Sequence, residues 1–190
     1  MAEINTQSRT GVLTTGTNKN RLRLMKGDIT ALEVEAFVFY ARPDLALGSG
    51  FGSAIARRGG PSVKKELDQI GGIQPTESVV TSGGDLKARY IVHAAGPVFQ
   101  EENLEGKLCA TIRGALQCAE GRGIRQIAFP PMGAGFYGVP LALCSDLMIR
   151  TIREYFAAGG TLEEVIICAN DEREYGPFAA RLAVPNQEPH

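Results

Sequence analysis

The sequence has no tryptophan, only two histidines and only four cysteines in 190 residues. The cysteines lie far apart in apolar segments without a Cys-x-x-Cys pair: Cys109, Cys118, Cys144 and Cys168. A free thiol in such a segment behaves as a small buried hydrophobe. Zinc needs clustered ligands, whereas the two histidines are His93 and the terminal His190. The sequence therefore argues against a metal site and against a disulfide framework, and it favours a reducing cytoplasm.

Charge and long apolar runs are also scarce. The formal net charge is −1 and no basic stripe stands out, which argues against duplex nucleic acid as a main partner. No apolar run approaches the roughly 20 residues that span a bilayer. The N-terminus lacks the basic-then-apolar layout of a secretory signal. We therefore expect a soluble protein that does not bind a membrane.

The length predicts a single domain over residues 20–183 that buries a substantial core. Residues 1–19 are polar and predict a flexible N-terminal arm or an edge strand, and residues 184–190 predict a frayed tail. Short apolar strands are expected at residues 21–25, 36–40, 78–81, 90–94, 127–129 and 165–168. Helices are expected at residues 53–58, 61–70, 102–120, 140–158 and 171–182. This alternation predicts a three-layer α/β/α sandwich.

Two glycine-rich stretches each follow an expected strand. In residues 45–55, glycines at alternate positions (48, 50 and 52) lead into a helix. Residues 130–140 form the second stretch. Glycine lets backbone N–H groups approach a ligand closely, and a helix N-terminus favours an anion. Two such loops in one small domain predict closure over one diphosphate; the alternative is that both are only tight turns.

A few side chains stand out as candidates for chemistry. Asp28 can accept a hydrogen bond from an adenine amino group, or it can cap a turn. Arg42 follows the strand at residues 36–40, at the end where α/β sheets bind ligands, and it can pair with phosphate or stack on the surface. Phe136 and Tyr137 can wall a sugar or base, or anchor their loop. His93, alone in an apolar strand, is typical of a core residue.

An ordered set of motifs between Leu22 and Leu182 resembles the macro domains, which bind ADP-ribose and related nucleotides. The motifs are Gly27-Asp28-Ile29-Thr30, residues 45–55, Val92-His93-Ala94-Ala95-Gly96-Pro97 and Gly133-Ala134-Gly135-Phe136-Tyr137-Gly138. The resemblance implies a mixed, twisted sheet of about six strands between helical layers. It also implies adenine at Asp28 and Ile29, with both glycine loops around the diphosphate and distal ribose.

The resemblance implies no cofactor, and it implies that ADP-ribosylated proteins are candidate partners. The ligand-binding residues expected from the motifs and the resemblance together are Asp28, Ile29, Arg42, Gly48, Ser49, Gly50, Phe51, Gly52, Ser53, Gly133, Ala134, Gly135, Phe136, Tyr137, Gly138 and Asn170.

The departures from the family pattern concern catalysis. Hydrolytic members usually carry Val-Asn-Ala-Ala-Asn, whose last Asn orients the distal ribose; the matching stretch here is Val38-Phe39-Tyr40-Ala41-Arg42. Those members often have an Asp that activates water where this chain has Gly52. General-base assistance and positioning are each worth orders of magnitude in rate. The substitutions therefore argue against an efficient hydrolase of the usual type.

Three functions remain open from the sequence. The first is a module that binds ADP-ribose, free or attached to protein, or a closely related nucleotide. The second is an enzyme that removes ADP-ribose or acetyl groups, or dephosphorylates an ADP-ribose phosphate (Appr-1″-p processing), by a changed mechanism involving Arg42, Tyr40 or substrate-assisted water. The third is an α/β domain whose site is filled by Phe39, Tyr40, Arg42 and Phe51, and which binds something else or only a partner protein.

Overall fold

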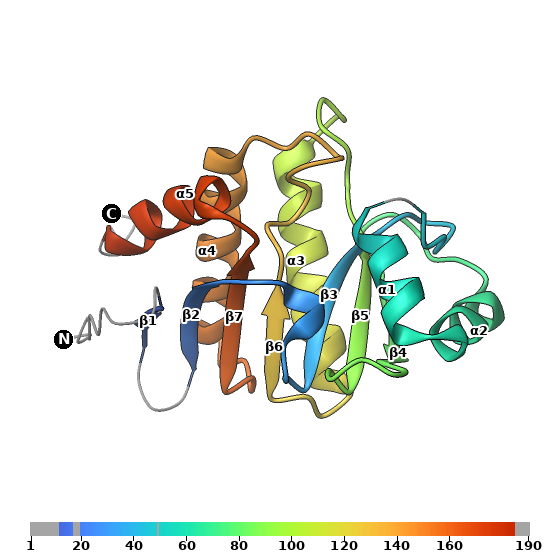
Figure 1. The fold of residues 1–190 in the computed structure, drawn as a ribbon. Coiled ribbons are helices and arrows are strands. Elements are labelled where there is room, and N and C mark those ends of the chain that lie inside the picture. Colours follow the sequence, from blue (N-terminus) through green and yellow to red (C-terminus); the bar gives the residue numbers. More distant parts are fainter. Residues whose placement is uncertain (1–11, 17–19, 49, 185–190) are drawn as a thin grey trace.

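The computed structural model describes residues 12–16, 20–48 and 50–184. These residues form a seven-stranded sheet in the order β1-β2-β7-β6-β3-β5-β4 between two helical layers (Figure 1). The inner strands are parallel: β2 (Arg21–Lys26), β7 (Glu164–Ala169), β6 (Gln126–Phe129), β3 (Ala36–Ala41) and β5 (Tyr90–Ala95). The edge strand β4 (Ser78–Ser82) is antiparallel to β5. The prediction of a three-layer α/β/α sandwich with a mixed sheet is confirmed.

The strand beyond the expected six is β1 (Leu13–Thr15), which pairs antiparallel with β2. It falls within residues 1–19, for which the sequence left both a loose arm and an edge strand open. Residues 1–11 and 17–19 lie outside the described residues, as do residues 185–190 of the expected tail. The limits of the arm and of the tail therefore stay predictions.

Strand β3 shows why the sheet carries helices on both faces. All six of its residues are buried. Val38 and Tyr40 pack into the core beneath one helical layer, whereas Phe37 and Phe39 pack into the core beneath the other. Successive side chains of a strand point to opposite faces, so an uninterrupted apolar strand needs cover on both sides.

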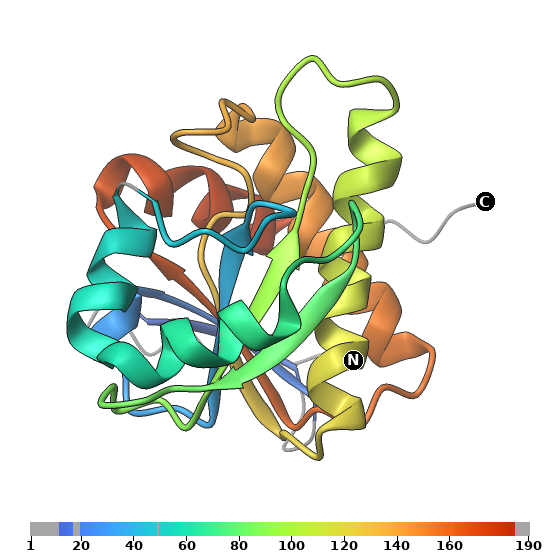
Figure 2. The same ribbon diagram turned by 90° about the vertical axis from the view of Figure 1, so that its right-hand side faces the viewer.

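The two helical layers differ in size (Figure 2). On one face lie α3 (Leu104–Gly121), α4 (Leu141–Ala157) and α5 (Glu172–Ala183). On the other lie the 3-10 helix η1 (Ile29–Ala31), α1 (Phe51–Gly59) and α2 (Pro61–Ile70). None of the helices within the described ranges combines the length and the apolar character needed to cross a membrane.

The start of α1 corrects one boundary of the sequence analysis. The helix was expected from Ser53, with residues 48–53 forming a loop. It begins instead at Phe51, because Gly50 adopts φ 63° and ψ −125° at the N-cap position and turns the chain into the helix two residues earlier. Phe51, Gly52 and Ser53 therefore belong to the first helical turn.

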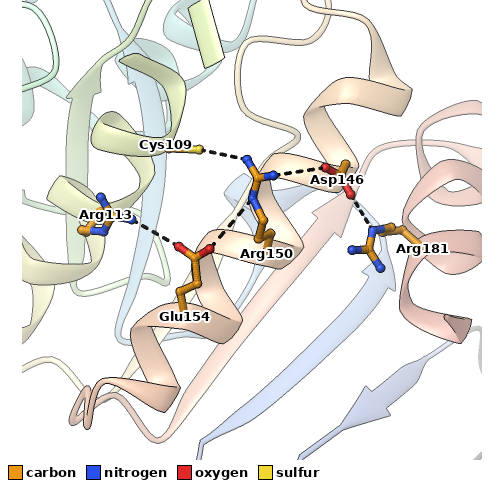
Figure 3. Close-up of polar contacts among 6 residues, drawn as sticks. All are labelled: Cys109, Arg113, Asp146, Arg150, Glu154 and Arg181. Atoms are coloured by element: carbon orange, nitrogen blue, oxygen red, sulfur yellow. Dashed lines mark hydrogen bonds and ion pairs between the residues drawn. The ribbon is translucent and has the colours of Figure 1, made fainter. Parts of the chain in front are cut away.

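Ion pairs tie the outer surfaces of α3, α4 and α5 together (Figure 3). Arg113 on α3 contacts Glu154 on α4 at 3.3 Å, and Arg181 on α5 contacts Asp146 on α4 at 2.7 Å. Arg150 lies between these two carboxylates, 3.9 Å from each. Such partly exposed pairs each contribute up to about 1 kcal/mol, so they supplement the apolar core rather than replace it.

The parallel strands end at a common edge of the sheet. Gly27 follows β2, Asn170 follows β7, Pro130 follows β6, Arg42 follows β3 and Gly96 follows β5. Ligands of open α/β sheets bind at the carboxyl ends of the strands. The segments singled out from the sequence therefore meet at the edge where a site is expected.

Candidate functional site

A cavity of about 600 Å³ opens at this edge, across the ends of β2, β7, β6 and β3. Most of the residues expected to bind a ligand line it: Asp28, Ile29, Arg42, Gly48, Gly50, Phe51, Gly52, Gly133, Ala134, Phe136, Tyr137 and Asn170. Ser53, Gly135 and Gly138 belong to the same segments but do not line the cavity. Ser49 lies outside the described residues.

At the β2 end, Asp28 is the N-cap of η1. Its Oδ1 accepts hydrogen bonds from the Thr30 amide at 2.9 Å and from the Thr30 hydroxyl at 2.6 Å. The Arg58 guanidinium of α1 donates to Asp28 Oδ2 and to the Thr30 hydroxyl. Asp28 thus caps a turn, as one interpretation predicted, and it also lines the cavity, whereas its contact with an adenine amino group stays a prediction.

These contacts keep the Asp28 carboxylate ionised. The Thr30 hydroxyl is the main cause that holds the pKa of Asp28 below its usual value; burial opposes it, and the Arg58 guanidinium and the Thr30 amide lower the pKa further. Among the residues that the structure describes, Oδ1 has two donors and Oδ2 has one. Since each carboxylate oxygen has about two lone-pair sites, Oδ2 retains a place for one further donor from a ligand.

The N-terminus of α1 forms one long wall of the cavity. Gly50, Phe51 and Gly52 line it, and Gly50 places no side-chain cap on the first helical amides. The Ser53 hydroxyl donates to the Gly48 carbonyl and so ties the turn to the helix. The first amides of a helix have no intrahelical acceptor and carry partial positive charge. This wall suits an anion.

Gly52 is constrained by its neighbours rather than by its backbone conformation. A Cβ built on Gly52 would lie 3.2 Å from Cζ of Phe39 and 3.3 Å from the backbone of Leu47. Phe39 also packs edge-to-face on Phe51 at 5.3 Å between ring centroids. Phe39 therefore occupies the space beside Gly52, and a larger residue at position 52 would force these neighbours to move.

The loop between β6 and α4 forms the opposite wall. Gly133, Gly135 and Gly138 all adopt positive φ, at 75°, 81° and 76°. The loop closes on itself, because Gly138 N donates to Gly135 O and Val139 N donates to Gly133 O, each at 3.0 Å. Gly133 has no room for a side chain, since a Cβ would lie 2.8 Å from Val139 Cγ2. The wall is thus built from backbone.

The two aromatic residues of this loop behave differently. Tyr137 is half-buried and packs on the Tyr40 ring at 4.7 Å between centroids, so it anchors the loop. Phe136 is 88% exposed at the rim of the cavity. Phe136 is therefore free to cover a ligand, whereas Tyr137 supports the loop.

Arg42 lies at the β3 end of the cavity and is ion-paired with Asp44. Its Nε and Nη2 donate to the two carboxylate oxygens of Asp44 at 3.1 and 2.6 Å. The Arg42 side chain remains 58% exposed. Arg42, Phe136 and Tyr137 also line a second cavity of about 470 Å³, which lies at the ends of β3 and β5. Arg42 thus borders the first cavity without filling it.

Tyr40 and Phe39 also line the cavity, and neither side chain supplies a proton to a ligand near pH 7. Tyr40 donates its hydroxyl to the Pro97 carbonyl, and burial raises its pKa far above the usual value. His93 is fully buried behind Phe39, with Nε2 2.9 Å from the Thr81 hydroxyl. Burial lowers the pKa of His93 to about 4, so the ring is neutral at pH 7, as expected of a core residue.

At the β7 end, Cys168, Asn170 and Glu174 line the cavity. The Cys168 thiol donates to the Gly27 carbonyl at 3.3 Å, and burial raises its pKa to about 12, so it is not nucleophilic. The backbone N–H of Asn170 donates to Glu174 Oε2 at 2.7 Å. Within the described ranges, no three His, Cys, Asp or Glu side chains gather closely enough to hold a metal ion.

Two of these residues were missed from the sequence. Arg58 is separated from Asp28 by 30 positions, and nothing local in the sequence pairs them. Glu174 had a readable signal, because Asp171 followed three residues later by an acidic residue is a capping pattern at the start of a helix. That pattern predicts that the Glu174 carboxylate folds back onto the Asp171 N–H, whereas the structure holds it on the N–H of Asn170, one residue earlier.

Comparison with known proteins places this site in a family. The Macro domain family model matches residues 41–148. An O-acetyl-ADP-ribose deacetylase of Cronobacter sakazakii is 30% identical over 175 residues, which cover 89% of this chain and 97% of that protein.

Solved structures agree with the sequence comparison. The Oceanobacillus iheyensis macrodomain with ADP has a TM-score of 0.86 at 26% identity, over 92% of this chain and 96% of that one. The Trypanosoma brucei macrodomain in complex with ADP-ribose has a TM-score of 0.80 at 29% identity, over 85% of this chain and 69% of that one. The chain belongs to the macro domain family.

Proposed function

We propose that this protein binds ADP-ribose, or a closely related nucleotide, in the cavity at the carboxyl edge of the sheet. The observation that carries the proposal is the pairing of two backbone walls around one cavity, the uncapped start of α1 and the glycine loop after β6. Such walls offer amide donors to a diphosphate without the desolvation of a buried charged side chain. Similar macrodomains have been solved with ADP and with ADP-ribose.

The proposed orientation of ADP-ribose follows from the groups that the cavity presents at its β2 and β3 ends. The adenine amino group donates to Asp28 Oδ2, beside Ile29, at the β2 end. The diphosphate lies between Gly50–Gly52 and the loop from Gly133 to Tyr137. The distal ribose lies at the β3 end beside Arg42. This orientation brings the anionic group to the backbone donors and keeps it away from the Asp28 carboxylate.

The proposal extends to ADP-ribose attached to proteins. The second cavity begins where the distal ribose is placed, and it shares Arg42, Phe136 and Tyr137 with the first. Because the two cavities share these residues, the proposed position for a group joined to that ribose is the second cavity. We therefore propose ADP-ribosylated proteins as partners.

Efficient hydrolysis of the usual macro type is not part of the proposed function. Phe39 packs against Gly52, so the position of the water-activating Asp holds no base and has no space for one without rearrangement. Arg42, where the ribose-orienting Asn stands in hydrolytic members, is paired with Asp44. The carboxylates that line the first cavity, Asp28 and Glu174, lie at the β2 and β7 ends rather than at the β3 end.

The enzymatic alternative rests on the similar protein named O-acetyl-ADP-ribose deacetylase. A route in which the diphosphate itself positions the water would need only the backbone walls. The test is incubation with O-acetyl-ADP-ribose and with an ADP-ribosylated carboxylate acceptor, beside an active hydrolase. We expect no efficient turnover, and turnover within about tenfold of the control enzyme would contradict the proposal. Loss of that turnover in Arg42→Ala would then assign the chemistry to Arg42.

Binding itself is tested by calorimetric titration with ADP-ribose, ADP, AMP and NAD. ADP-ribose is expected to bind more tightly than AMP, because AMP lacks the second phosphate and the distal ribose. Absent or only millimolar binding of all four would favour a domain whose site no longer takes a nucleotide.

A further inference from the structure

Glu174 places a carboxylate in a cavity that is proposed to bind an anionic ligand, and a hydrogen bond fixes the position of this carboxylate. Its side chain is 15% exposed, and Oε2 accepts the Asn170 amide hydrogen at 2.7 Å. The other carboxylate oxygen, Oε1, has Arg173 Nη2 only at 3.8 Å, beyond hydrogen-bond distance. One oxygen is thus fixed by the backbone, and the other has no hydrogen-bond donor among the described residues, so it can accept from a ligand.

The order of the strands shows which part of the ligand meets Glu174. Asp28 follows β2, Glu174 lies just beyond β7, the glycine loop follows β6 and Arg42 follows β3, and these strands are neighbours in that order. Neighbouring strands are about 4.8 Å apart, which is the scale of one ribose ring or one phosphate. The groups of ADP-ribose follow in the order adenine, ribose, diphosphate, ribose. In the proposed orientation, the adenine-side ribose therefore lies at the end of β7.

Electrostatics agrees with this placement. The first turn of α5 carries Glu172 and Glu174, and Asp171 caps it. These carboxylates offset the attraction that a helix N-terminus exerts on anions. A carboxylate next to phosphate would be repelled, whereas a carboxylate next to ribose hydroxyls accepts a hydrogen bond from them. An acidic residue on the ribose 2′-hydroxyl is also how dinucleotide-binding proteins distinguish a free hydroxyl from a 2′-phosphate.

We propose that Glu174 accepts a hydrogen bond from the 2′-hydroxyl of the adenine-side ribose and excludes nucleotides that carry a 2′-phosphate there. This inference rests on the proposed function, because it takes the orientation of ADP-ribose from it. The inference specifies the class of ligand. Nucleotides derived from a dinucleotide without a 2′-phosphate are bound, and their 2′-phosphorylated counterparts are rejected.

The capping contact of Glu174 requires a variant that preserves it. In Glu174→Gln the amide oxygen still accepts from the Asn170 N–H, so the start of α5 is retained while the charge is removed. Glu172→Gln is the matched control, because Glu172 lies in the same helical turn, pairs with Lys26 and does not line the cavity. Thermal denaturation of both variants checks that any loss of binding is not a loss of folding.

The experiment is a calorimetric titration of the wild type and the two variants with ADP-ribose, 2′-phospho-ADP-ribose and 2′-deoxy-ADP-ribose. The wild type should prefer ADP-ribose over each analogue by roughly tenfold or more, as for a hydrogen bond to a charged group. Glu174→Gln should reduce both preferences to about threefold or less, and Glu172→Gln should keep them.

Two results would overturn the inference alone. One is equal wild-type affinity for ADP-ribose and its 2′-phosphate; the other is an equal loss of preference in both variants. Failure of the wild type to bind ADP-ribose at all is a different result, because it overturns the proposed function and this inference with it.

Discussion

Replacement of Asp28 by asparagine tests the adenine end of the site without disturbing the fold. Asparagine is as good an N-cap as aspartate, so Asp28→Asn should preserve the contact with the Thr30 amide that starts η1. It removes the negative charge and the second acceptor oxygen, Oδ2, on which the adenine amino group is proposed to bind. The variant thus separates the role of Asp28 in binding from its role in capping.

The expected magnitude follows from the contacts of the carboxylate. A hydrogen bond to a charged group contributes about 1.5–3 kcal/mol, so Asp28→Asn should raise the Kd for ADP-ribose by roughly 10- to 150-fold. The ion pair with Arg58 is nearly half exposed on both sides and contributes at most about 1 kcal/mol to folding. Binding should therefore fall much more than stability.

Calorimetry and thermal denaturation measure the two effects, and two controls make the result interpretable. A hypoxanthine analogue of ADP-ribose lacks the amino group, so the wild type should bind it weakly and Asp28→Asn should no longer discriminate against it. Arg58→Gln removes the ion pair and keeps the carboxylate, and we expect a change of about threefold or less. Wild-type affinity in Asp28→Asn, or an equal loss in Arg58→Gln, would refute the proposed contact.

Three further predictions concern the walls and the core. Gly50→Val and Gly135→Val should sharply weaken ADP-ribose binding, because valine resists the positive φ that shapes each wall. The control is Gly71→Val, which replaces a glycine at φ 82° outside the cavity and should bind ADP-ribose normally. Gly52→Asp should lower stability by about 1–3 kcal/mol without creating efficient hydrolysis, because its side chain meets Phe39 and Leu47, and turnover near that of an active hydrolase would contradict this. The pKa of His93 is about 4 in the folded protein and 6.5 in the unfolded chain, so between these pH values only the unfolded state binds a proton at this group. The free energy of unfolding, measured by urea denaturation, should therefore fall by about 3 kcal/mol from pH 7 to pH 4 through His93. The variant His93→Gln should lack that part of the loss.

Most of the fold could be predicted from local sequence patterns. Residues 36–40 are apolar throughout, which indicates a strand covered on both faces, and β3 is such a strand. The start of α1 was misplaced by two residues, because glycine at an N-cap gives no side-chain signal and Phe51 looked like part of a loop. The short strand β1 was one of two alternatives, since three residues carry too little periodicity to decide between them.

The candidate site was predictable in outline and not in its long-range contacts. The glycine loops and Asp28 could be found because each follows a strand in a recognisable motif. The ion pair of Asp28 with Arg58 and the packing of Phe39 against Gly52 join residues far apart in sequence. Such contacts depend on how α1 docks on the sheet, which periodicity does not describe. Glu174 was missed for the same reason, although its capping pattern was present.

Binding of ADP-ribose between the start of α1 and the glycine loop after β6 can be followed in amide nitrogen–proton NMR spectra during a titration, because both walls consist of backbone N–H groups. We expect large shifts for Asp28, Gly50–Gly52 and Gly133–Tyr137, with little change in α2 or in the outer faces of α3 and α4. Shifts confined to other surfaces, or no shifts at millimolar ligand, would contradict it.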